Sequence, residues 1–207
     1  MKHSNKQSPA IIAALVLSAA TFSADAGLYP PAAPPDSAFV RVFNATPQGR
    51  LKATIGDHAI PDAAPMDASS YVFLPPGSYP AKISGAEKTV SLDSKRCYTA
   101  AAEPGAIQLF DQDCFNSQLK SLVSVYNLID GATLSVKVGE NGPAVIDGVA
   151  ANTAGHREVN PVKADLVVYN GGTKLAQAKP VTLERGKVFS LFVTGSVAAP
   201  VLTWVVN

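Results

Sequence analysis

The chain has 207 residues, of which 47% are hydrophobic, and its 17 Lys and Arg side chains almost balance 16 Asp and Glu side chains. Nucleic-acid binding depends mainly on clustered basic side chains that displace phosphate counterions, and this sequence has no basic run. The same balance disfavours purely electrostatic binding of a highly acidic polymer. We therefore expect no nucleic-acid partner.

Residues 1–26 have the pattern of a secretory signal peptide. Lys2 and Lys6 precede the apolar run 10–20, and Ala-Asp-Ala at 24–26 has the small-x-small form that signal peptidase cleaves. The apolar run is too short to cross a bilayer core of about 30 Å as a helix, which needs about 20 residues. We predict cleavage after residue 26 and export from the cytoplasm. Cleavage removes two of the 17 basic and one of the 16 acidic side chains, so the mature chain is neutral, with 15 of each.

Residues 27–36 form a proline-rich arm ahead of the first predicted strand. Its four prolines favour an extended conformation that cannot pair fully in a sheet. The arm either separates the folded part from the signal peptide or docks on a partner protein, because a stiff segment loses little entropy on binding. The candidate partner-binding residues in the arm are Leu28, Tyr29, Pro30 and Pro31.

The sequence after residue 36 is typical of an all-β protein. Short runs rich in Val, Ile, Phe, Tyr and Thr recur between turn-forming residues, and no segment of helical length keeps a three-four apolar spacing. Many short antiparallel strands at close spacing favour a β-sandwich or barrel over a βαβ fold, with a hairpin turn at the Asn-Gly-Gly sequence 170–172. The predicted strands span residues 39–43, 51–55, 71–74, 79–84, 89–92, 97–102, 107–110, 122–126, 134–138, 144–149, 164–169, 189–193 and 202–206.

Two segments of the chain have nearly the same strand sequence. Residues 39–44 (FVRVFN) match residues 122–127 (LVSVYN) at a shift of 83, and the same shift sets 53–57 on 136–140. In both copies apolar and polar residues alternate, and this alternation assigns Arg41 to the solvent-facing side of its strand.

A later and weaker match pairs residues 90–95 with 181–186 at a shift of 91. Together the matches predict two tandem small β-sandwich domains, 37–118 and 119–207. The alternative is one larger sandwich whose strands resemble each other only because β-strands favour the same residue types.

Cys97 and Cys114 both lie in the exported part of the chain, where disulfides form and persist. Their spacing of 17 residues fits neither a C-x-x-C redox motif nor a zinc finger. We predict one structural disulfide, which stabilises by about 3 kcal/mol for a loop of this size. A reactive thiol is the alternative, but no histidine lies near either cysteine in sequence to activate it.

Residue types that support catalysis are scarce. A catalytic triad needs a histidine as base, and beyond residue 26 only His58 and His156 remain, both in polar segments typical of solvated loops. No serine stands in a G-x-S-x-G elbow, and no glycine-rich loop leads into a helix. Asp111 and Asp113 could hold a cation, although their place beside a cysteine is more typical of a loop. We expect no catalytic residue, no cofactor and no metal site.

The opening of the mature chain, LYPPAAPPDSAFVRVFNA at 28–45, resembles the start of the mature region of the AlgF family of alginate O-acetylation proteins. The similarity continues through LPPGSYPAKI at 74–83 and, more loosely, over both predicted domains. The resemblance implies a periplasmic, non-catalytic adaptor that binds and positions the acetylating enzymes. Its implied partners are periplasmic acetyltransferase-type enzymes and a membrane-bound acyltransferase. Related machinery also serves cellulose, so the polymer is alginate or another exported glycan.

Two other functions stay open at this point. A carbohydrate-binding module could present aromatic side chains to the nascent polysaccharide, although several of them sit in strand patterns where burial is expected. The candidate aromatic residues are Tyr29, Tyr71, Tyr79, Tyr126, Tyr169 and Trp204. The third possibility is a direct acetyltransferase with an unusual site.

Overall fold

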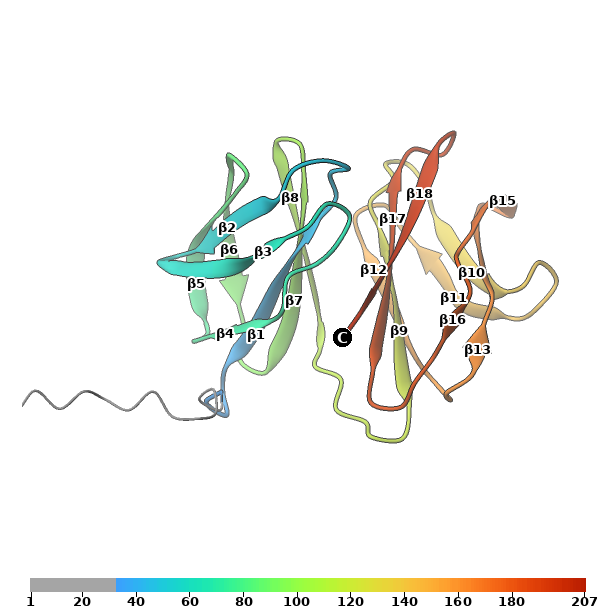
Figure 1. The fold of residues 1–207 in the computed structure, drawn as a ribbon, viewed down its shortest axis with the longest axis horizontal. Helices are drawn as coiled ribbons and strands as arrows, with labels where there is room; N and C mark the ends of the chain where they lie inside the picture. The colour runs from blue at the N-terminus through green and yellow to red at the C-terminus, as the bar shows by residue number, and fades with distance from the viewer. Residues whose placement is uncertain (1–32) are drawn as a thin grey trace, which may run out of the picture. The chain divides into compact units, whose positions relative to one another are not determined.

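The computed structural model describes residues 33–207, in which every regular element is a β-strand (Figure 1). The all-β prediction is therefore confirmed. The predicted signal peptide and the arm residues Leu28, Tyr29, Pro30 and Pro31 lie outside the described residues. Across residues 33–207 the chain has no helix of the length and apolarity that a bilayer crossing requires.

The first half of the described chain folds into a sandwich of two four-stranded sheets, here called the first sandwich. Its core of buried side chains draws on all eight strands, from Val40 and Val42 to Ile107. The sheet that carries this sandwich's contact with the rest of the chain is called its inner sheet. The inner sheet has the order β4 (Val72–Leu74), β1 (Ala38–Asn44), β7 (Arg96–Glu103), β8 (Ala106–Asp113), and the outer sheet the order β3 (His58–Ala63), β2 (Leu51–Ile55), β5 (Gly77–Ile83), β6 (Ala86–Leu92).

The second half builds a second sandwich on the same plan, with its own buried core. A short two-stranded sheet lies beside the four-stranded ones. The inner sheet has the order β12 (Ala154–Val159), β9 (Ser121–Asn127), β17 (Val188–Gly195), β18 (Pro200–Val206); the outer sheet has the order β11 (Ala144–Val149), β10 (Leu134–Val138), β14 (Leu166–Asn170), β15 (Thr173–Gln177); the short sheet pairs β13 (Lys163–Ala164) with β16 (Val181–Thr182).

The two sandwiches have the same strand order, so each strand of one inner sheet has a counterpart in the other: β4 and β12, β1 and β9, β7 and β17, β8 and β18. The predicted fold of two tandem β-sandwiches is confirmed, and the junction between residues 118 and 119 stays a prediction. The continuous hairpin β5–β6 corresponds to a hairpin interrupted between β15 and β16. Pro180 lies in that interruption, and proline has no N–H to give to a ladder.

The antiparallel pairing expected from the sequence does not extend to the centre of each inner sheet. There β1 pairs with β7 and β9 pairs with β17 in parallel. Between the two members of each pair the chain crosses to the outer sheet, returns to the inner sheet as the antiparallel edge strand β4 or β12, and crosses to the outer sheet once more. The Asn-Gly-Gly turn joins β14 and β15 as predicted, with positive φ at Gly171 and Gly172.

Three strands of the four-stranded sheets were not predicted from the sequence: β3, β12 and β15. All three lie at sheet edges, where one side of the strand has no neighbour. Edge positions tolerate charges and proline, as at Pro61 in β3 and Arg157 in β12, so the apolar alternation that marks a strand is lost.

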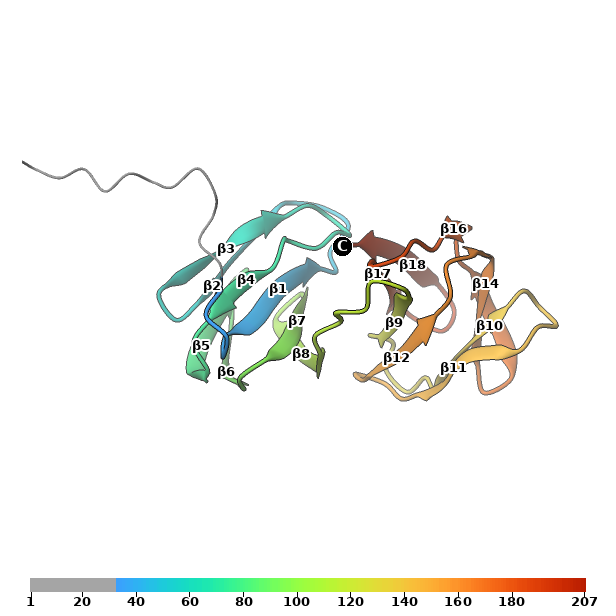
Figure 2. The ribbon, with the colours of Figure 1, turned by 90° about the horizontal axis from the view of Figure 1, so that it is seen from below.

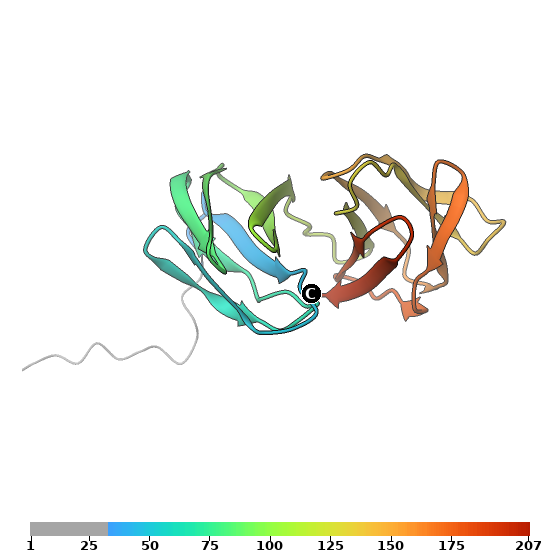
Figure 3. The same cartoon turned by 90° about the horizontal axis from the view of Figure 1, so that it is seen from above.

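The inner sheets pack against each other through a third cluster of buried side chains. Its members are Phe43, Ala101, Phe110, Tyr126, Leu128, Phe192 and Val205. Phe43 stacks on Phe192 with ring centroids 3.6 Å apart, and Phe192 stacks on Tyr126 at 4.5 Å. Figures 2 and 3 show strands of the two inner sheets facing each other across this contact, and residues 33–207 form one compact unit. Strands β1 and β9 are consequently buried on both faces.

Candidate functional site

Arg41 lies in the middle of the contact between the inner sheets and is 0% exposed. The prediction that it faces solvent is wrong, because the second sandwich covers the face that alternation assigns to water. Its Nε donates to Thr99 Oγ1 at 3.0 Å, and its Nη2 donates to Ser190 Oγ at 2.8 Å. A further guanidinium N–H donates to the Asn207 side-chain oxygen. Arg41 therefore joins β1 of the first sandwich to β17 and to Asn207, the residue after β18, in the second sandwich.

The positive charge of Arg41 is stabilised by hydrogen bonds to neutral side chains. Among residues 33–207 no carboxylate forms an ion pair with it. Its guanidinium carbon lies 5.0 Å from the ring centre of Tyr71 and 5.9 Å from that of Phe192, within range of cation–π attraction. Burial raises the pKa of Tyr71, although the nearby Arg41 charge acts in the opposite direction. A buried cation with only neutral partners depends on every one of these contacts.

Ser124 occupies the position in β9 that Arg41 occupies in β1, and it is also 0% exposed. Its hydroxyl lies 2.9 Å from Nδ1 of His156 on the neighbouring strand β12. His156 is therefore part of a strand and not of a solvated loop, and desolvation lowers its pKa. The pair has the residue types of a nucleophile and a base. A fully buried hydroxyl, however, cannot reach a polymer substrate.

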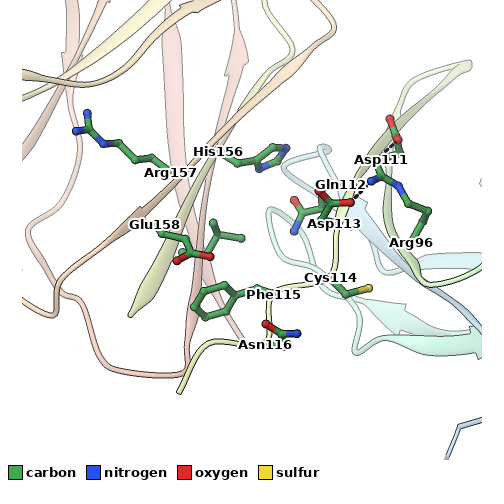
Figure 4. A pocket seen from close by; sticks show the side chains of 11 residues that line it. Arg96, Asp111, Gln112, Asp113, Cys114, Phe115, Asn116, His156, Arg157 and Glu158 are labelled. Atoms are coloured by element: carbon green, nitrogen blue, oxygen red, sulfur yellow. Dashed lines mark hydrogen bonds and ion pairs between the residues drawn. The ribbon is translucent and has the colours of Figure 1, made fainter. Parts of the chain in front are cut away.

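A hollow of about 380 Å³ opens beside this pair, between the two sandwiches (Figure 4). The His156 ring points from β12 toward the side chains of the first sandwich. The hollow is lined by Arg96, Asp111, Gln112, Asp113, Cys114, Phe115, Asn116, Leu122, His156, Arg157 and Glu158. Its lining mixes charges of both signs with the rings of Phe115 and His156, so it does not select strongly for an anion or a cation.

The two carboxylates considered as a cation site are already occupied by a protein cation. Arg96 forms ion pairs with both Asp111, at 2.5 Å, and Asp113 (Figure 4). In the part of the chain that the structure describes, no three His, Cys, Asp or Glu side chains gather in a metal-binding arrangement. The guanidinium thus takes the place that the sequence left open for a metal ion.

Cys97 and Cys114 form the predicted disulfide, with the sulfurs 2.04 Å apart. The bond ties β7 to the segment that leaves β8 toward the second sandwich, at the border of the hollow. The strand before it contributes Gln112, whose side-chain oxygen accepts a hydrogen bond from the Tyr126 hydroxyl at 2.9 Å. The disulfide therefore fixes the part of the chain that supplies one side of the contact.

The remaining candidates from the sequence lie apart from this site. His58 is the exposed first residue of β3 and does not line the hollow described above. The sequence reasoning missed the contact itself, and one indication was available: Phe43, Tyr126 and Phe192 occupy positions that alternation assigns to solvent. Three aromatic rings on predicted outer faces indicate that something covers those faces.

Comparison with known proteins gives consistent matches over most of the chain. The family described as alginate O-acetyl transferase AlgF matches residues 12–190. Alginate biosynthesis protein AlgF of Pseudomonas aeruginosa is 40% identical over 196 residues, which cover 93% of this chain and 90% of that protein. The proteins of the same name in Pseudomonas fluorescens and Azotobacter vinelandii are 41% and 37% identical; the matches cover 92% and 83% of this chain and 87% and 79% of theirs.

Two solved structures from Pseudomonas aeruginosa also match. The C-terminal domain of AlgF is 40% identical, with 43% of this chain and 99% of that structure covered and a TM-score of 0.39. The N-terminal domain of AlgF is 39% identical, with 39% of this chain and 99% of that structure covered and a TM-score of 0.36. Each of these structures holds one domain and so covers less than half of this chain.

Proposed function

Because this chain belongs to the AlgF family of alginate biosynthesis proteins, which act in alginate O-acetylation, we propose that it is a non-catalytic periplasmic adaptor that binds and positions the acetylating enzymes. The observation that carries the proposal is the shared core between the inner sheets. It joins two sandwiches into one compact unit and leaves the outer sheets and the sheet edges free to bind two different partners. The partners in this proposal are periplasmic acetyltransferase-type enzymes and the membrane-bound acyltransferase.

The non-catalytic role is supported by the place of the one serine–histidine pair described above. Acyl transfer needs a nucleophile that the donor and the acceptor can both approach, whereas Ser124 is 0% exposed. The hydroxyl bonds to His156 as a structural hydrogen bond across strands β9 and β12. An adaptor needs no reactive group at this position.

The proposed site of action is the periplasm. The Cys97–Cys114 disulfide fits an oxidising compartment, and residues 1–26 have the pattern of an export signal. N-terminal sequencing of the protein recovered from periplasmic extract tests this part. A first residue of Gly27 is expected, and an intact N-terminus would contradict the predicted cleavage.

The adaptor role is tested by the acetyl-ester content of the exported polysaccharide from a strain that lacks the gene. Loss of acetyl groups at unchanged polymer yield is expected, and the wild-type gene restores them. A gene with Ser124→Ala restores them equally if the serine is structural, whereas a folded Ser124→Ala protein that fails to restore them would indicate catalysis. A pull-down from periplasmic extract completes the test. Association with the periplasmic acetylation enzymes is expected, and a lack of association would contradict the adaptor function.

Sugar binding is the second candidate, favoured only by the hollow beside Phe115 with its polar lining. Most aromatic candidates have other uses. Tyr126 and Tyr169 are buried, and the indole N–H of Trp204 donates to the Lys179 carbonyl at 3.0 Å. Titration of the purified protein with deacetylated polymer separates the two functions: an adaptor gives no change in intrinsic fluorescence or in backbone amide resonances.

A further inference from the structure

Edge strands expose unpaired main-chain groups that can accept an additional strand, and natural sheets usually protect them with charges or short length. The four-stranded sheets of residues 33–207 have eight edge strands. Strand β4 has only three residues, and β18 has seven residues without a charge, PVLTWVV. The other six each carry a charged side chain: Asp62 in β3, Lys88 in β6, Asp111 in β8, Asp147 in β11, Arg157 in β12 and Lys174 in β15.

The hydrogen-bond register leaves part of the β18 main chain free. Val188 and Asn207 exchange two backbone hydrogen bonds, of 2.9 and 3.0 Å. Because bonded pairs alternate along an antiparallel ladder, Val205, Thr203 and Val201 also direct their N–H and C=O groups toward β17. The residues between them, Leu202, Trp204 and Val206, direct these groups away from the sheet. Within residues 33–207 no other main chain pairs with them.

Exposed apolar side chains gather around the same strand. Val197 lies in the turn before β18, and Val201 and Val206 lie on β18; they are 46%, 46% and 49% exposed. They account for three of the seven large hydrophobic side chains that are exposed in the described part of the chain. A free strand edge flanked by apolar side chains provides both the main-chain bonds and the apolar contacts that strand addition uses.

The counterpart of β18 in the first sandwich is closed to such pairing. Strand β8 carries Asp111 and Asp113, and the Lys88 ammonium donates to the Ile107 carbonyl at its edge, at 3.1 Å. The duplicated scaffold therefore has one protected edge and one open edge at equivalent places. The difference lies in the side chains and not in the fold.

We propose that the outer edge of β18 binds an extended, uncharged segment of a partner protein, which adds to the inner sheet as a fifth strand beside Leu202, Trp204 and Val206. The proposal rests on the adaptor function and specifies where one of its partners binds. A partner strand with small or β-branched apolar residues and without proline fits the uncharged edge. A stable dimer of this chain fits less well, because pairing along three outward residues buries far less than the about 800 Å² per partner of a stable interface, whereas a transient contact with an enzyme can be smaller.

The test compares two substitutions at one position in protein purified from the periplasm. Leu202→Pro removes the outward N–H and places a ring at the edge, while the ladder to β17 keeps its bonds. Leu202→Ala removes the same side-chain packing but keeps the N–H, so it is the matched control. Binding to each purified periplasmic acetyltransferase-type enzyme of the same complex is measured by calorimetry. For one enzyme we expect binding that is about tenfold weaker or more with Leu202→Pro than with Leu202→Ala.

Equal binding of the two variants would overturn the β18 proposal and leave the adaptor function standing. Failure of the wild-type protein to bind any of these enzymes would overturn both. A homodimer that Leu202→Pro dissolves would also overturn the proposal, since the occupant would then be a second copy. If Leu202→Pro does not fold, amide hydrogen exchange in the wild-type complex decides: slower exchange at Leu202, Trp204 and Val206 supports the proposal, and unchanged exchange contradicts it.

Discussion

Strands β1 and β9 have nearly the same sequence, and a comparison of their residues separates the positions that hold each sandwich together from those that face the other sandwich. Asn44 and Asn127 end the two strands in the same way: each side-chain N–H₂ donates to two backbone carbonyls, and each side-chain oxygen accepts an N–H from two residues further on. Arg41 and Ser124, three residues earlier, are at equivalent places but make unrelated contacts. The asparagine that ends each strand makes the same contacts in both sandwiches, whereas the Arg41/Ser124 position, which faces the other sandwich, differs; the neighbouring Phe43/Tyr126 position is aromatic in both.

The largest effect is expected from Phe192→Ala. This ring stacks between Phe43 and Tyr126, whereas the equivalent place in β7 holds Ala101. Truncation of a buried phenylalanine costs about 3–5 kcal/mol, which chemical denaturation of the purified protein measures. A cost below about 1 kcal/mol would mean that the inner sheets are not held together by this core.

Asn44→Ala and Asn127→Ala are expected to destabilise by similar amounts, about 2–3 kcal/mol each, because each leaves buried backbone groups without a partner. The unfolding free energies of the two variants should agree within about 1 kcal/mol. A larger difference between the two unfolding free energies would show that the two strand ends are not equivalent. Exposed Asn160→Ala is the control, with an expected change of about 0.5 kcal/mol or less.

Arg41→Met is expected to cost about 2 kcal/mol, less than truncation of Phe192. Methionine fills part of the volume but leaves Thr99 and Ser190 without the bonds that the guanidinium supplies. The substitution of Arg50, which is exposed and forms a single 3.9 Å ion pair, should change the unfolding free energy by no more than about 0.5 kcal/mol. Adding Ser190→Ala and Thr99→Val to Arg41→Met should recover part of the loss, and a further loss would contradict this assignment.

The smallest effect concerns His156 and pH. Its pKa is lowered in the folded protein, so the unfolded chain binds more protons near neutral pH and below. The contribution of His156 is present above the unfolded pKa of about 6.5 and is lost as the pH falls toward the folded value. The midpoint of thermal unfolding should therefore fall between pH 7 and 5 by a larger amount in wild type than in His156→Gln. Equal slopes would contradict the shift.

The sequence predicted the scaffold better than the contact. Strand β9 was found because Leu122 and Val123 start an apolar alternating run, and the duplication followed from its match to β1. Burial of Arg41 could not be predicted, because alternation describes a strand with one solvent-exposed face, whereas β1 and β9 are buried on both faces. The Ser124–His156 contact joins residues 32 positions apart, and its formation depends on the pairing of β12, an edge strand too polar to be recognised.

In the proposed export, translocation delivers the N-terminal part first, so β1 emerges long before Ser190 and Asn207, which supply two of the hydrogen bonds to the guanidinium. The first sandwich can close on its own core and disulfide, but its Phe43 face meets water until the final strands arrive. During that interval the apolar face is open to aggregation, and a chain truncated before β17 would keep this face exposed.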